Sequence, residues 1–191
     1  MFERLRQEAI ENSRGKSWLA RLPVFLGLAY VLLRFLFNPD YASILAPLDL
    51  GIHELGHLLT SFLGQTVCVA SGTLAQLAVP VFSVFNFYRQ KDFFAIAASL
   101  GWLAVNLFEV ARYCADARSL SLPLVSVFGQ EGVVHDWEYL LGKAGLLPYD
   151  RAIAAGIRTL GDGFLLCSLA MALWVLWVMR DFSLTQSKTG V

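Results

Sequence analysis

Apolar runs about as long as a membrane is thick recur along this chain of 191 residues. A helix that crosses the hydrocarbon core needs about 20 predominantly apolar residues. The runs at 18–37, 41–64, 67–88, 93–109 and 153–179 reach or approach this length. Inside lipid every backbone polar group must be satisfied within the protein, so we expect these runs to be helices. The sequence therefore predicts an all-α integral membrane protein, a bundle of about five transmembrane helices.

The composition agrees with a membrane protein and argues against several other classes. Hydrophobic residues make up 57% of the chain and charged residues 16%, whereas soluble domains have about 45–50% and about 25%. The formal net charge is zero, so no charge excess favours nucleic acid as a partner. The three cysteines lie far apart without C-x-x-C spacing, which indicates neither a thiolate metal site nor a disulfide framework.

Three parts follow one another along the chain. Residues 1–17 mix acidic and basic side chains, unlike a cleaved signal sequence, and we expect a cytoplasmic amphipathic helix there. Residues 18–180 form a single transmembrane domain, and residues 181–191 form a polar tail. Basic residues gather near the amino terminus at Arg4, Arg6, Arg14, Lys16 and Arg21. The positive-inside bias predicts a multi-pass protein of the cytoplasmic membrane with its N-terminus inside.

Small and helix-breaking residues interrupt the run at 67–88. Ser71, Gly72 and Thr73 come first, and Pro80 follows. Irregular backbone at membrane depth is tolerated only where it is buried in protein or lines a wet cavity. We therefore expect one broken or re-entrant segment here, with Gln76 and the residues of the break as hydrogen-bond donors to a substrate. Packing of small residues between helices is the plainer alternative.

The most specific chemical signal is the pentapeptide H-E-L-G-H at 53–57, which matches the motif H-E-x-x-H inside an apolar run. On a helix, His53 and His57 project from one face and can bind the same zinc ion. Glu54 lies beside the open side of such an ion, where a water molecule needs a base. Asp49 lies one turn before His53. It could hold the second nitrogen of that ring or serve as a first-turn acid that the helix dipole favours.

A hydrolytic zinc site needs a third protein ligand and one open position. The remaining histidine of the chain is His135, and Asp136 follows it. Neighbours on a helix point about 100° apart, so we expect one of the two to bind the ion directly. Glu109 is a rival ligand, although it could instead pair with Arg112 where its helix leaves the membrane. It belongs to a polar stripe at helical spacing that consists of Asn106, Glu109, Tyr113 and Asp116.

A membrane-embedded H-E-x-x-H at 53–57, followed by a glycine-bearing stretch and a later acid-bearing segment, resembles the site-2-protease group of intramembrane zinc metallopeptidases. In that family the two motif histidines and an aspartate from a later helix bind zinc, and the motif glutamate activates water. The resemblance implies that His53 and His57 are ligands, that Glu54 is the base, and that Asp136 takes the place of the later aspartate. The family's usual N-P-D-G or L-D-G context and a PDZ-like insertion are absent, so the chain would be a minimal, divergent member.

These features predict a Zn²⁺-dependent hydrolase, an intramembrane metalloprotease that cleaves peptide bonds of membrane-protein or peptide substrates. A non-proteolytic zinc-binding membrane protein, such as a pseudo-protease, a sensor or a membrane chaperone, is the alternative. A third hypothesis is a structural membrane protein in which the polar residues only hold helices together. The sequence names neither the substrate nor the oligomeric state.

Overall fold

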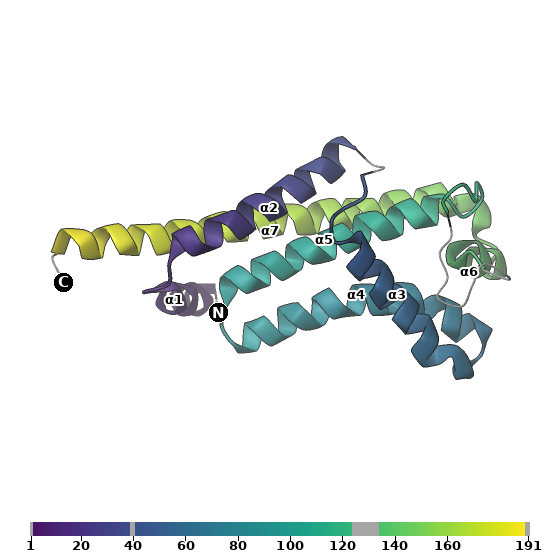
Figure 1. Cartoon of the computed structure of the whole chain (residues 1–191), viewed down its shortest axis with the longest axis horizontal. Coiled ribbons are helices and arrows are strands. Elements are labelled where there is room, and N and C mark those ends of the chain that lie inside the picture. Colours follow the sequence, from purple (N-terminus) through teal and green to yellow (C-terminus); the bar gives the residue numbers. More distant parts are fainter. Residues whose placement is uncertain (1, 39–40, 124–133, 190–191) are drawn as a thin grey trace.

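The computed structural model describes residues 2–38, 41–123 and 134–189, and the regular structure in these ranges is helical throughout (Figure 1). The α-helices are α1 (Phe2–Ser13), α2 (Trp18–Phe37), α3 (Ala46–Thr60), α4 (Gln65–Arg89), α5 (Phe93–Ala115), α6 (Asp136–Ala144) and α7 (Asp150–Thr189). Single 3₁₀ turns join α3 to α4 and α6 to α7, and these are η1 (Ser61–Leu63) and η2 (Leu147–Tyr149). The predicted all-α fold is confirmed.

Four helices in the described ranges are long and apolar enough to cross a membrane. They are α2, α4, α5 and the stretch Leu147–Asp181, most of which is α7. We expected about five. The difference is α3, which has 15 residues and at 1.5 Å per residue is only about 22 Å long. This is less than the roughly 30 Å of a hydrocarbon core, so α3 is too short to span it upright.

The expected break in the run at 67–88 is wrong. The helix α4 continues through residues 71–73 and through Pro80 without interruption. Small residues in a membrane helix let a neighbouring backbone approach instead of ending the helix. A proline is tolerated there because surrounding groups can satisfy the freed carbonyl. The small residues of α4 therefore indicate close packing.

The closest packing of that kind is between α3 and α4. A Cβ atom added to Gly56 would lie 2.4 Å from the carbonyl oxygen of Ser71, so only glycine permits this approach. The irregular backbone lies between the two helices, where η1 leads to Gly64 with φ of +90°. Glycine adopts this conformation without steric cost. Thus α3, η1 and α4 make a tight helical hairpin.

The long helices α5 and α7 run antiparallel beside each other and form the scaffold (Figure 1). Two buried apolar clusters hold it together. One contains Ala97 of α5, Val175 of α7 and Ala9 of α1. The other joins Phe35 of α2 to Phe108 of α5 and further residues of α7. Burial of Ala9 agrees with the amphipathic helix expected at the amino terminus.

The two ends of the molecule carry different elements. At one end, α1 meets the turn between α4 and α5, and the C-terminal part of α7 lies at this end as well (Figure 1). Lys91 pairs with Glu8 at 2.6 Å, and Lys16 pairs with Asp92 at 3.5 Å. The helix α3, η1, the start of α4, α6 and the end of α5 lie toward the other end (Figure 1). In addition, α7 continues to Thr189, so the expected polar tail at 181–191 is largely the end of a helix.

Candidate metal centre

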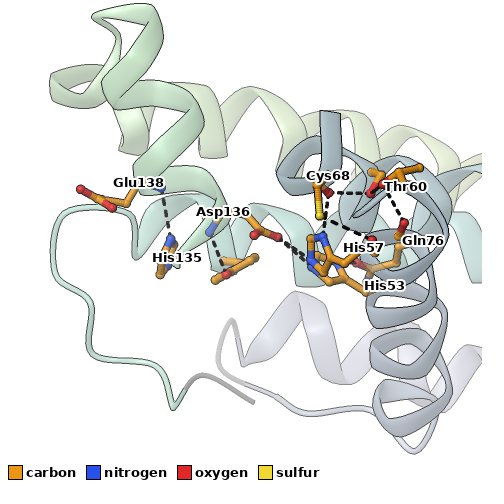
Figure 2. A network of polar contacts seen from close by, with 11 residues as sticks. His53, His57, Thr60, Cys68, Gln76, His135, Asp136 and Glu138 are labelled. Carbon is orange, nitrogen blue, oxygen red and sulfur yellow. Dashed lines mark hydrogen bonds and ion pairs between the residues drawn. The ribbon is translucent and has the colours of Figure 1, made fainter. Parts of the chain in front are cut away.

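The spacing of the motif on α3 brings two imidazoles together, and the first turn of α6 brings a carboxylate to them. The rings of His53 and His57 have centroids 4.7 Å apart. Asp136 is distant in sequence, yet its Oδ2 atom lies 2.8 Å from Nε2 of His53 and 3.2 Å from Nε2 of His57. Figure 2 shows the carboxylate turned toward both rings. His53 and Asp136 are buried, and His57 is half-buried.

These distances match the separations between ligand atoms around one metal ion. Nitrogen and oxygen ligands bind zinc at about 2.0–2.1 Å in a tetrahedron, which puts neighbouring ligand atoms about 3.3 Å apart. The three atoms lie within 4.8 Å of one another. Within the described part of the chain, His53, His57 and Asp136 form the group of three acidic, histidine or cysteine residues that comes this close.

The hydrogen bonds behind the imidazoles favour a cation in front of them. Nδ1 of His57 lies 2.8 Å from the carbonyl oxygen of Cys68 and must therefore carry a proton. Nδ1 of His53 lies 3.1 Å from Oε1 of Gln76. A neutral imidazole has one N–H, so in the neutral state both Nε2 atoms direct a lone pair at the Asp136 carboxylate, whereas a protonated ring forms an ion pair with it. A cation bound to all three atoms removes this repulsion, and such outer hydrogen bonds are the usual supports of metal-binding histidines.

Gly72 of α4 keeps open the space next to these nitrogens. A Cβ atom added to Gly72 would lie 2.5 Å from Nε2 of both His53 and His57. Contacts below 3.0 Å are essentially never seen for real Cβ atoms. Gly72 was expected to be part of a helix break, whereas its structural role is to leave room for the site.

Asp49 does not support His53, so the first of the two roles considered for it is wrong, whereas it does lie in the first turn of α3, as the second role requires. Its Oδ1 atom accepts hydrogen bonds from Nε1 of Trp102 at 2.7 Å and from Nδ2 of Asn106 at 3.4 Å. Asp49 is fully buried, and a buried carboxylate needs donors, which α5 supplies. The outer partner of His53 comes from the neighbouring helix α4, as the amide of Gln76.

Asn106 and Glu109 lie behind the ligand group. Nδ2 of Asn106 also donates to the carbonyl oxygen of Trp102 at 3.0 Å. Glu109 accepts a hydrogen bond from Nε2 of Gln76 at 3.4 Å and another from the hydroxyl of Ser43 at 3.2 Å. Glu109 therefore contacts Gln76, which in turn contacts His53. Glu109 is not one of the three residues whose ligand atoms converge.

His135 faces away from the group. Its Nδ1 atom accepts a hydrogen bond from the backbone N–H of Glu138 at 3.2 Å, which makes it the N-cap of α6 (Figure 2). Its Nε2 atom lies 3.6 Å from Oδ2 of Asp116. Burial lowers the pKa of His135, against the opposing effect of nearby acids such as Asp116. Of the two adjacent candidates, Asp136 therefore meets the histidines and His135 begins the helix.

A cavity of about 670 Å³ opens beside the ligand group. Its volume lies in the range of about 300–1,000 Å³ that is usual for ligand sites. Its walls include His53, Glu54, His57 and Asp136, together with parts of α4, α5 and the segments next to α3 and α6. The half-buried Glu54 thus lines the same cavity as the three ligand residues.

Two contributors were not expected to act at the site. One is the backbone carbonyl of Cys68, which binds Nδ1 of His57. The sequence could not predict it, because every residue has a backbone carbonyl. The other is Tyr113, whose hydroxyl accepts a hydrogen bond from the backbone N–H of Asp136 at 3.1 Å. The sequence feature that could have pointed to Tyr113 is its position in the polar stripe of α5.

Comparison with known proteins adds no relative, since no family model, no curated protein and no solved structure matches this chain. The chemistry of the site must therefore be argued from the residues that form it.

Proposed function

We propose that this protein is a zinc-dependent hydrolase that works within the membrane and cleaves peptide bonds of membrane-protein substrates, in the manner of the site-2-protease group it resembles. One observation carries the proposal. His53 and His57 from α3 and Asp136 from α6 converge on one point, beside Glu54 and on the wall of a cavity. Four apolar helices of span length support the membrane setting.

Two imidazoles and one carboxylate leave a fourth position for water, which is the arrangement of catalytic zinc sites. An ion held there polarises the substrate carbonyl and brings the pKa of water toward neutrality. The same ligand types also suit Fe²⁺. The adjacent glutamate favours hydrolysis, because a water molecule made acidic by a metal needs a base.

In the proposed reaction, Glu54 takes a proton from water while the water oxygen forms a bond to the carbonyl carbon. The electron pair of the C=O bond moves onto the carbonyl oxygen. When this intermediate collapses, the C–N bond breaks and Glu54 passes its proton to the amine that leaves. A substrate helix must first unwind locally, because its carbonyls are engaged in its own hydrogen bonds.

The test compares Glu54→Gln with Glu138→Gln, a matched change on α6 whose side chain points away from the ligand group (Figure 2). Both variants and the wild type are produced in cells that lack the endogenous protein, and new N-termini in the membrane proteome are mapped. We expect N-termini inside apolar segments with the wild type and Glu138→Gln but not with Glu54→Gln, at one metal ion per chain in all three. Identical cleavage with Glu54→Gln, or metal binding without any cleavage, would overturn the protease and favour the non-proteolytic alternative.

We infer that the protein lies in the inner membrane of the cell and that the end of the molecule with α1 faces the cytoplasm. The ion pairs of Glu8 and Asp92 bring the turn between α4 and α5 to this end. It therefore gathers the basic residues Arg4, Arg6, Arg14, Lys16, Arg21, Arg89 and Lys91, as the positive-inside bias requires. The metal group then lies toward the opposite face.

Labelling with a membrane-impermeant maleimide tests this orientation. Gln7→Cys and Lys143→Cys are made separately in a chain in which Cys68, Cys114 and Cys167 are replaced by serine. In intact cells we expect label on Lys143→Cys, and on Gln7→Cys only after permeabilisation. The opposite pattern would reverse the orientation.

A further inference from the structure

The proposed hydrolysis requires a hydrogen-bond donor as well as a base. Negative charge develops on the carbonyl oxygen of the substrate, and donors directed at that oxygen commonly contribute a factor of about 10²–10³ in rate. Ionised Glu54 can only accept hydrogen bonds. The donor must therefore come from another group on the cavity wall.

The donors expected from the sequence either take part in other hydrogen bonds, as Gln76 and Ser71 do, or lie away from the cavity, as Thr73 does. The amide of Gln76 uses its oxygen for His53 and its nitrogen for Glu109. None of residues 71–73 lines the cavity. The hydroxyl of Ser71 also donates to the carbonyl oxygen of Cys68. The small residues of α4 thus serve packing, and the donor has to be sought on another helix.

Tyr113 on α5 has the required position. It lines the cavity, and its ring stands edge-on to His53, with centroids 6.1 Å apart and an interplanar angle of 67°. On the other side its ring packs against His135 at 4.3 Å. Its oxygen accepts the hydrogen bond from the backbone N–H of Asp136. This bond does not use the phenol proton, so that proton is available for donation.

We propose that the phenol of Tyr113 donates a hydrogen bond to the carbonyl oxygen of the substrate as that oxygen becomes negatively charged. The inference rests on the proposed function. The phenol oxygen lies 3.1 Å from the amide nitrogen of Asp136, the residue whose carboxylate completes the ligand group. The phenol therefore lies close to the ligand group. The proton stays on the phenol throughout, and Glu54 supplies the proton that the leaving amine needs.

A purely positioning role predicts different behaviour. If Tyr113 only held the start of α6 in place, removal of its hydroxyl would weaken metal binding, because the backbone of Asp136 would lose its partner. If Tyr113 acts on the substrate oxygen, the metal stays bound and the affinity for a negatively charged oxygen next to the metal falls. Tyr113→Phe separates the two roles.

The experiment uses the full-length protein in detergent, loaded with Co²⁺, whose visible spectrum reports the ligand set. Acetohydroxamate, which presents anionic oxygen to a bound metal, is titrated in. For Tyr113→Phe we expect an unchanged Co²⁺ content and spectrum, with acetohydroxamate bound about tenfold more weakly, the effect of one hydrogen bond to a charged group. Tyr149→Phe, at an exposed tyrosine that does not line the cavity, is the matched control and should bind the probe like the wild type.

Equal affinity of Tyr113→Phe and wild type for acetohydroxamate would overturn the inference, and so would a loss of Co²⁺ from Tyr113→Phe, which indicates positioning only. Failure of the wild type to bind Co²⁺ would instead overturn the proposed function. With a substrate identified by mapping N-termini, Tyr113→Phe should lower kcat about 100-fold at unchanged KM.

Discussion

The α3–η1–α4 hairpin and the α5–α7 scaffold are held together in different ways. Between α5 and α7 the contacts are chiefly apolar side chains, with Phe108 packed over Gly161 so closely that a Cβ there would lie 2.8 Å from its ring. One buried hydrogen bond, from the hydroxyl of Ser168 to the carbonyl oxygen of Ala97, also joins them. Between α3 and α4 the contacts are backbone approach and polar bonds, such as the one from Thr60 to Ser71. The scaffold thus contributes mainly packing, and the hairpin contributes the two histidines of the ligand group, which Asp136 of α6 completes.

Burial distinguishes α5 from the other long helices. In the most apolar stretch of each helix, 72% of the residues of α5 are buried inside the protein, but only 33% of those of α4 and of the stretch Leu147–Asp181 that includes most of α7. Lipid is as apolar as leucine, so α4 gains little from burying more apolar surface. Its position next to α3 depends instead on glycine and on hydrogen bonds. Changes in the hairpin should therefore affect metal binding, and changes in the scaffold should affect stability.

The largest expected effect is that of Gly72→Ala. The added methyl group would crowd both Nε2 atoms, so we expect zinc affinity to fall by more than about 1,000-fold, since both histidine ligands are displaced. Competition with a chromophoric chelator measures this affinity. Gly163→Ala on α7 is the control, because its methyl group would meet nothing within 4 Å. Zinc binding by Gly72→Ala at wild-type strength would refute the role given to this glycine.

Replacement of the carboxylate ligand should have the next largest effect. We expect Asp136→Ala to weaken zinc binding more than about 100-fold, because it removes the one charged ligand. His135→Ala should keep zinc within a few-fold and cost about 1 kcal/mol of stability as a lost N-cap. Zinc content and thermal unfolding of both variants, measured side by side, check this. Zinc lost from His135→Ala and kept by Asp136→Ala would reverse the assignment.

A scaffold change should have the smallest effect on the site. Phe108→Ala leaves a cavity between α5 and α7, for which we expect a loss of about 3–5 kcal/mol of stability from lost packing. The zinc bound per folded chain should not change. Unfolding of the protein in micelles measures the stability, with the exposed Phe85→Ala of α4 as the control. If Phe108→Ala released zinc from folded protein, the two helix pairs would not be independent.

Much of the fold follows from local patterns in the sequence. Apolar runs between charged turns predicted α2 at its observed bounds of Trp18–Phe37 and α5 to within a few residues. Spacing of four residues placed His53 and His57 on one face, because helix geometry is set locally. For the third ligand the sequence left His135 and Asp136 open. Their directions depend on where α6 begins, and His135 lies at its N-cap with extended backbone.

The sequence by itself determined a helical membrane protein with a histidine pair and a neighbouring acid on one helix face, since periodicity and hydrophobic length act over a few turns. Only the tertiary structure decided that Gln76 and not Asp49 supports His53, and that Cys68 contributes its carbonyl. It also decided that Gly72 marks an open space and not a break. These outcomes depend on how closely α3, α4 and α5 approach one another, and that distance is set by contacts between helices and not by the local pattern of the sequence.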